Sequence, residues 1–104
     1  AGRQIWMVDP ERRVEYSEHL KFKLQVRRIP EKMPERIYRQ AQERYFDNHT
    51  GRHVAILSVT YHRRLRLMMI AYDEFEDYTE IVTIHPVEKQ QIQSRVRSGR
   101  WTYE

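Results

Sequence analysis

VAILSVTY, residues 54–61, and LRLMMIAY, residues 65–72, are the stretches of the chain that decide its fold. Each is nearly all apolar, which is typical of a strand in the centre of a sheet. Only three residues, 62–64, separate them, and so short a connection suits antiparallel strands. A third segment, residues 78–85, alternates polar and apolar residues after an acidic loop at 73–77. The three strands are therefore predicted to form an antiparallel meander.

The residues at the start of the chain predict a short hairpin. The apolar run at residues 5–8 and the alternating residues 13–16 are separated by Asp9-Pro10. Asp and Pro are the preferred residues at the first two positions of a type I turn. We therefore expect two short strands joined by this turn.

Two helices are expected between the hairpin and the meander. Ser17 is a suitable N-cap for a first helix ending near Arg28, because the residue before Pro30 is disfavoured in a helix. A second helix is expected from residues 30–34 to the turn-rich loop at 47–51. Its buried stripe is predicted from apolar residues that recur every four positions, namely Met33, Ile37, Ala41 and Tyr45.

A last helix is predicted over residues 87–98, with Gly99 as its C-terminal stop and residues 100–104 as a tail. Grouped helices and grouped strands indicate the α+β class. The sequence thus predicts a single domain, residues 1–104, in which two N-terminal helices pack on an antiparallel sheet. The sheet consists of the short N-terminal hairpin and the three-stranded meander, and a C-terminal helix follows it.

The charge balance points to an anionic partner. Lys and Arg number 19 and Asp and Glu number 15, so the net charge is +4. Most of the cations are arginines, whose planar fork suits phosphate. This favours nucleic acid, an anionic membrane or an acidic protein, while an Arg-rich solvated surface is the alternative. No apolar run approaches the roughly 18 residues of a membrane span, and no signal peptide is recognisable, so neither insertion into a membrane nor secretion is expected.

Cofactor chemistry is not expected. The absence of cysteine excludes disulfides, thiolate metal sites and cysteine nucleophiles, and fits a reducing cytoplasm. His49 and His53 are four residues apart but flank a loop, without an acidic partner at a metal-ligand spacing. Three glycines cannot build a Gly-rich phosphate loop, and no serine nucleophile elbow occurs. We therefore expect neither a metal nor an organic cofactor.

His85 is the most suggestive candidate for chemistry. It ends a predicted strand, where a side chain can reach a ligand, and its ordinary pKa near 6.5 suits proton transfer at neutral pH. The alternative is a polar strand-end residue bonded to backbone.

Three arginines crowd one strand connection. Pleating puts Arg64 and Arg66 on one side of the strand and Arg63 on the other. An arginine within an apolar strand is costly unless it is paired or reaches water. Arg66 therefore either pairs with an acid such as Glu80 or faces a working groove.

A second basic group follows on the last predicted helix and the tail. Cations interleaved with aromatic residues suit phosphate contact combined with base stacking. The alternative is a solvated helix face with the tryptophan packed on the body of the domain. The candidates for this nucleic-acid-binding surface, together with Arg63, are Arg95, Arg97, Arg100 and Trp101.

Two segments carry a resemblance to a known family. Residues 16–19 (YSEH) and 27–30 (RRIP) resemble the opening of the DUF4258 group, in which a histidine opens the first helix and an arginine closes it. His19 and Arg27 have that spacing, although Arg28 stands where the group usually has glycine. The order helix–helix–strand–strand–strand is similar to that of the RelE/ParE toxin superfamily, which includes ribonucleases and gyrase inhibitors.

The resemblance implies a RelE-like fold and a toxin-like, metal-independent ribonuclease or translation inhibitor with an antitoxin protein as partner. Its substrate would be RNA, either free or as ribosome-bound mRNA. Cleavage requires a base for the ribose 2′-hydroxyl, cations for the phosphorane and an acid for the leaving oxygen. His85 is then the candidate base or acid, Arg64 and Arg66 the phosphate clamp, and Tyr61 or Tyr78 an orienting group or proton donor.

Two alternatives to an enzyme stay open. One is a non-catalytic module that binds nucleic acid or an acidic protein through Arg95, Arg97 and Arg100. The other is a protein-interaction domain, with the sheet edge and Trp6 or Trp101 forming a dimer or antitoxin contact. Whether the protein is a monomer or a homodimer is left open as well.

Overall fold

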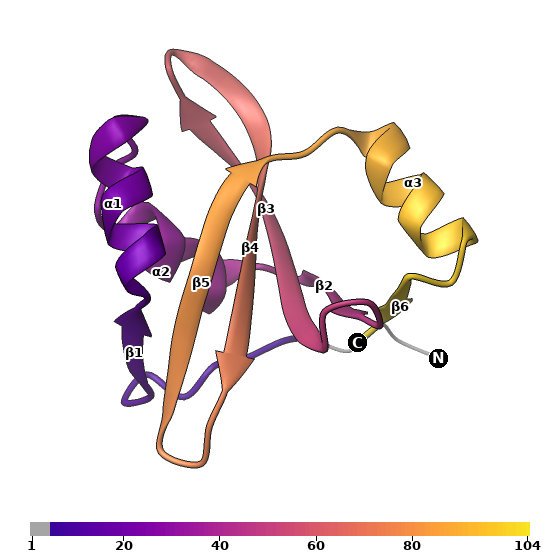
Figure 1. Cartoon of the computed structure of the whole chain (residues 1–104), viewed down its shortest axis with the longest axis horizontal. Helices are drawn as coiled ribbons and strands as arrows, with labels where there is room; N and C mark the ends of the chain where they lie inside the picture. Colours follow the sequence, from indigo (N-terminus) through magenta and orange to yellow (C-terminus); the bar gives the residue numbers. More distant parts are fainter. Residues whose placement is uncertain (1–4) are drawn as a thin grey trace.

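The computed structural model describes residues 5–104, and the first four residues of the predicted domain, 1–4, lie outside the described residues. Figure 1 shows a twisted sheet flanked by helices, as expected for the α+β class. The elements, in chain order, are β1 (Arg13–Tyr16), α1 (Glu18–Val26), α2 (Met33–Gln40), β2 (Glu43–Asp47), β3 (Arg52–Tyr61), β4 (Arg64–Glu74), β5 (Tyr78–Pro86), α3 (Lys89–Arg97) and β6 (Trp101–Tyr103).

The central meander is confirmed. β3 pairs antiparallel with β4 and β4 antiparallel with β5, and the sheet order is β1-β5-β4-β3-β2-β6. Tyr61 and Arg64 close the β3–β4 hairpin as register partners, so the turn consists of His62 and Arg63 alone. Both turn residues have positive φ, which is the geometry of the type I′ turn that matches the twist of a hairpin.

The predicted N-terminal hairpin is wrong. Residues 5–8 form no strand, and β1 lies parallel to β5, so the sheet is mixed rather than purely antiparallel. The Asp9-Pro10 turn does form, with the backbone N–H of Arg12 donating to the carbonyl of Asp9. The chain leaves that turn toward β5 because the Arg12 guanidinium donates to the backbone carbonyls of Phe75, in the β4–β5 loop, and of Tyr78, the first residue of β5.

The second helix is shorter than predicted. α2 ends at Gln40, and Tyr45 belongs to β2. Ala41 has extended backbone angles, and the buried guanidinium of Arg44 donates to the carbonyls of Tyr38 and Ala41 at the end of the helix. The four-residue spacing that extended the predicted helix to Tyr45 is therefore coincidental.

The predicted C-terminal tail contains a strand. β6 pairs antiparallel with β2 at the edge of the sheet, and Asp47 is the register partner of Trp101. The indole of Trp101 is stacked on the ring of Tyr45, with 5.2 Å between centroids. Through Trp101, this strand contributes to the core on the face of the sheet where α3 lies.

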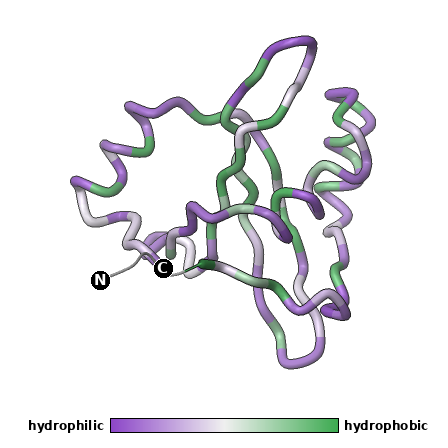
Figure 2. The backbone as a smooth tube through the Cα atoms, turned by 180° about the vertical axis from the view of Figure 1, so that it is seen from behind, coloured by the Kyte–Doolittle hydropathy of each residue, from purple (hydrophilic) through white to green (hydrophobic). Residues whose placement is uncertain are grey.

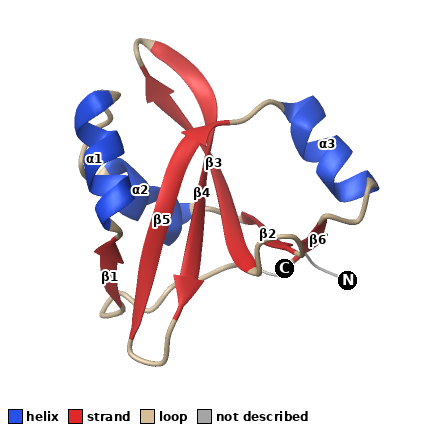
Figure 3. Ribbon diagram, viewed as in Figure 1, coloured by secondary structure: helices blue, strands red, loops and turns tan. Residues whose placement is uncertain are grey.

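The two faces of the sheet carry separate cores. α1 and α2 cover one face, and α3 lies across the other, as Figures 1 and 3 show. The central strands are coloured hydrophobic over much of their length in Figure 2, whereas the tip of the β3–β4 hairpin is hydrophilic. The α1–α2 core includes Leu20, Ile37, Ile70, Ile81 and Ile84, and the α3 core includes Tyr45, Val54, Met69, Ile92 and Trp101.

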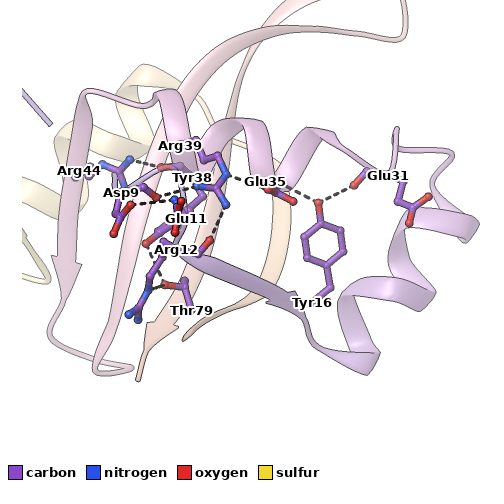
Figure 4. Close-up of polar contacts among 10 residues, drawn as sticks. All are labelled: Asp9, Glu11, Arg12, Tyr16, Glu31, Glu35, Tyr38, Arg39, Arg44 and Thr79. Carbon is purple, nitrogen blue, oxygen red and sulfur yellow. Dashed lines mark hydrogen bonds and ion pairs between the residues drawn. The ribbon is translucent and has the colours of Figure 1, made fainter. Parts of the chain in front are cut away.

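Several arginines belong to the fold rather than to a ligand site. Arg12, Arg39 and Arg44 tie the N-terminal segment and α2 to the sheet, as Figure 4 shows. Arg39 bonds to Glu35 at 2.9 Å and to the carbonyl of Arg12 at 2.7 Å, and Arg44 also donates to the hydroxyl of Tyr72. Their donors are occupied by protein acceptors, so they contribute little to an anion site.

Candidate anion-binding groove

A groove of about 470 Å³ lies where the end of α1, the β3–β4 hairpin and the end of β5 meet. In Figure 1 these three segments converge at the top of the sheet. Three segments far apart in sequence therefore contribute side chains to one concave surface. The polar lining residues are Lys23, Arg27, Arg28, Tyr61, His62, Arg66 and His85.

The positive charges that line the groove are not neutralised by carboxylates. The groove lining contains no aspartate or glutamate. Within residues 5–104, no carboxylate lies at ion-pair distance from Arg27, Arg28 or Arg66. Lys23 donates to the hydroxyl of Thr83 at 3.2 Å, a neutral partner. Guanidinium groups without acidic neighbours have their charge and their donors available to an anionic ligand.

Arg66 faces this groove, which resolves one alternative left by the sequence. Its guanidinium carbon lies 5.9 Å from the centre of the Tyr61 ring, a cation–π distance. Glu80 is the register partner of Asp73, toward the opposite end of β4, and is not its partner. The half-buried Arg66 therefore gains the face of an aromatic ring instead of a carboxylate.

Tyr61 supports the groove rather than supplying a free proton. The residue is 8% exposed, and its hydroxyl donates to the carbonyl of Arg27 at 3.1 Å. Its ring is stacked on the ring of His62, with centroids 3.9 Å apart. Tyr61 thus fixes the end of α1 to the hairpin and holds two groove residues in place.

His85 is half-buried at the exposed end of β5. Burial lowers its pKa below 6.5, and the positive charges of Lys23 and Arg95 lower it further, against a hydrogen bond with the Pro86 carbonyl at 3.2 Å. Burial and the charge of Arg27 similarly lower the pKa of Lys23. His85 is therefore neutral near pH 7, so its imidazole can accept a proton.

Arg64 lies on the neighbouring surface. It lines a second hollow of about 380 Å³ together with Arg66, Glu88 and Lys89, so Arg66 is common to both. Arg63, at the exposed hairpin turn, lines neither hollow. The predicted set Tyr61, Arg66 and His85 is thus gathered at the groove, and Arg64 extends the cationic surface away from it.

The predicted stacking surface at the C-terminus does not form as expected. Trp101 is 1% exposed, and the guanidinium of Arg95 covers its ring at 5.0 Å from the centroid. Arg100 binds Asp47, with Nη2 3.1 Å from Oδ2. The interpretation of Trp101 as a residue packed on the body of the domain is therefore right, and the base-stacking role is wrong. Of this group, Arg97 is exposed on α3.

The Asp47–Arg100 pair is a structural contact. Burial of Asp47 acts to raise its pKa, but hydrogen bonds from Arg100 and the His49 backbone N–H outweigh it, and with the positive charge of Arg100 they lower the pKa to about 2. Asp47 is therefore ionised in the folded protein, and Arg100 is paired with it, so that Arg100 is not available to a ligand.

The family-matched residues separate in the structure. Arg27 is the C-cap residue of α1 and lines the groove, whereas His19 is exposed in the first turn of α1 and does not.

Lys23, Arg28 and His62 are groove residues that sequence reasoning missed. Lys23 lies one helical turn before Arg27, a spacing that places both on one face of a helix. Arg28 could have been noticed because it occupies a position that usually favours glycine.

Residues 5–104 contain no group of three or more histidine, aspartate or glutamate side chains placed to hold a metal ion. Over the same range, no helix combines the length and the apolar character needed to cross a bilayer. Comparisons with protein-family models, curated proteins and solved structures found no match to the chain.

Proposed function

We propose that this protein binds RNA, with a backbone phosphate held in the groove between α1, the β3–β4 hairpin and β5. The single observation that supports this most strongly is the lining of the groove, which has four Lys or Arg residues and two histidines but no carboxylate. Such a site attracts an anion, and arginine forks match phosphate oxygens. Cations continue beyond the groove at Arg63, Arg64 and Lys89, which favours a polymer over a small phosphate ester.

The test is a titration of labelled single-stranded RNA at several salt concentrations. Each phosphate contact on a single strand contributes about 0.7 to the slope of log affinity against log salt. Four such contacts give a slope near −3, or a loss of roughly 50-fold between about 50 and about 200 mM salt. An affinity that does not respond to salt would contradict phosphate binding.

Two arginine variants locate the site. Arg66→Ala removes a guanidinium from the groove and is expected to weaken RNA binding by about tenfold, which corresponds to a contact of about 1.4 kcal/mol. Arg97→Ala removes an exposed guanidinium from α3 and is the matched control, with affinity expected to stay unchanged. The opposite pattern would move the interface to α3, as in the alternative of a binding module that uses the last helix.

A second candidate function is metal-independent RNA cleavage, and the position of His85 favours it. A neutral imidazole at a cationic groove can take the proton of a ribose 2′-hydroxyl while the resulting oxyanion attacks the adjacent phosphorus. Arg66 would stabilise the charge on the phosphorane, and the imidazole of His62 would be the candidate proton donor to the leaving 5′ oxygen. The products are a 2′,3′-cyclic phosphate and a 5′-hydroxyl, so atoms and protons balance.

Cleavage is tested with RNA in the presence of a chelator, with 2′-deoxy substitution of the substrate as the control. His85→Ala is expected to abolish product formation while changing RNA affinity by less than about threefold, because proton transfer and phosphate binding are separate roles. If the wild-type protein binds RNA and yields no product, it is a non-catalytic binding module. Toxicity on expression that His85→Ala relieves would support the toxin-like assignment and a search for an antitoxin.

A further inference from the structure

Left-handed backbone occurs at three non-glycine residues among residues 5–104, and all three lie at the groove or beside it. They are Arg28, His62 and Arg63, with φ of 52°, 51° and 65°. Arg28 and His62 line the groove, and Arg63 is the next residue in the hairpin turn. The remaining positive-φ positions are Gly51 and Gly99, which do not line it.

Each of the three positions is one where the fold itself favours another residue. Arg28 follows the C-cap of α1, with its N–H bonded to the Gln25 carbonyl and the Ile29 N–H bonded to the Leu24 carbonyl. This is the Schellman arrangement, in which glycine is the usual residue at the left-handed position. His62 and Arg63 form a two-residue hairpin turn, for which Asn-Gly is preferred.

The side chains at these positions are cationic or titratable, although the backbone would be less strained with Gly or Asn. Backbone strain retained at a ligand site is a sign that the side chain is needed there. Both turns are held rigidly, the first by the two hydrogen bonds above and the second by the Tyr61–Arg64 register pair. Their side chains therefore project from fixed points, and the exposure of Arg28 and Arg63 leaves the guanidinium groups accessible.

We infer that Arg28, His62 and Arg63 form a rim that binds the phosphates flanking the one in the groove, so that the ligand is an RNA strand several nucleotides long. This inference rests on the proposed function and adds the contact residues and the length of the ligand. A mononucleotide reaches the groove but not the whole rim, whereas a strand of about 12 nucleotides has phosphates for both.

If the rim binds RNA, replacing one of its residues by glycine should stabilise the fold and weaken RNA binding at the same time. Arg28→Gly and Arg63→Gly are each expected to raise Tm by roughly 3–5 °C through relief of strain, less the entropy that glycine adds to the unfolded chain. Each is also expected to weaken binding of a 12-nucleotide RNA by about 5–10-fold and to reduce the salt slope by about 0.7. Binding of a mononucleotide by Arg63→Gly is expected to change by less than about twofold, since Arg63 does not line the groove, whereas Arg28→Gly removes a groove residue and is expected to weaken mononucleotide binding as well.

Arg63→Lys is the matched control that keeps both the charge and the strain. We expect its Tm to be unchanged and its affinity for the 12-nucleotide RNA to stay within about threefold of wild type, because the phosphate contact needs a cation at this point. Arg97→Ala, away from the groove, is expected to change neither quantity.

The outcomes separate the rim from the groove. If Arg66→Ala weakens binding while both glycine variants bind like wild type, the rim is overturned and the groove stands. If the wild-type protein binds no RNA, the proposed function is overturned and the rim with it. If either glycine variant lowers Tm, these positions are not strained, and the reason for assigning their side chains to a ligand is lost.

Discussion

Substitution of Asp47 by asparagine provides the sharpest test of the structure, because Asp47 pairs β2 with the loop before β6. Its pKa of about 2 lies below the ordinary value of 3.8, so ionisation stabilises the folded state by about 2–3 kcal/mol at neutral pH. Asparagine keeps one acceptor oxygen for Arg100 but has no charge. We therefore expect Asp47→Asn to lower the free energy of unfolding by about 2–3 kcal/mol, and Tm by roughly 10 °C.

The pH dependence distinguishes this electrostatic effect from a packing defect. A carboxylate whose pKa is depressed by folding contributes its full stabilisation above about pH 4, and loses it as the pH falls toward 2. Urea unfolding of wild type and Asp47→Asn at several pH values is the measurement. The difference between the two proteins should be largest at neutral pH and should shrink toward zero near pH 2.

Two results would refute this reasoning. A stability difference that stays constant from neutral to acidic pH would mean that the side chain acts through shape and not through charge. A loss of RNA affinity in folded Asp47→Asn would mean that Arg100 serves the ligand as well as the fold. Neither is expected from the direct contact of Asp47 with Arg100, at 3.1 and 3.2 Å.

Three further predictions concern the groove and the core. The pKa of His85, followed by NMR, should lie below 6.5 in the free protein and rise when inorganic phosphate is added, since an anion offsets the charges that lower it; an unchanged titration would argue against anion binding beside it. Arg12→Ala should cost about 2 kcal/mol and speed amide hydrogen exchange in β1, because it removes hydrogen bonds to the β4–β5 loop and to the start of β5; slow exchange in β1 would show that the strand does not need this contact. Trp101→Ala should cost about 3–5 kcal/mol of unfolding free energy by leaving a cavity in the α3 core, with RNA affinity unchanged in the folded fraction; weaker binding by that fraction would restore the stacking role.

Local signals predicted the parts of the fold whose contacts are close in sequence. β3, β4 and β5 follow one another with short turns, so apolar runs and turn residues were sufficient to identify the meander. The Ser17 cap likewise predicted the start of α1, and its hydroxyl accepts from the Leu20 N–H at 3.0 Å.

The missed elements depend on partners far along the chain. β2 and β6 pair with each other, and neither has a strong alternation of its own in so few residues. The parallel pairing of β1 with β5 could not be read from residues 13–16, because the adjacent turn favoured a hairpin with the preceding residues. Here tertiary pairing overrode a local preference.

The site was predicted only in part for the same reason. Arg66 was conspicuous because it interrupts an apolar strand and His85 because it ends a strand, and the structure places both at one groove. Lys23 resembles an ordinary surface cation in the sequence, and only the docking of α1 beside β5 brings it to that groove. For Trp101 the sequence was misleading in the other direction. Its neighbouring arginines suggested a surface residue, but its ring is buried in the α3 core.

The parallel pairing of β1 with β5 also constrains how the protein is made. During translation β1 emerges first, but its partner strand appears only after β2, β3 and β4 have been synthesised. Arg12 must likewise wait for the carbonyls of Phe75 and Tyr78, which come after β4 in the chain. A nascent chain that stops before Tyr78 therefore has an N-terminal strand with no place on the sheet, and α1, which contacts β5, has no platform. Since contacts distant in sequence form slowly, addition of this edge strand is expected to be a late step in folding.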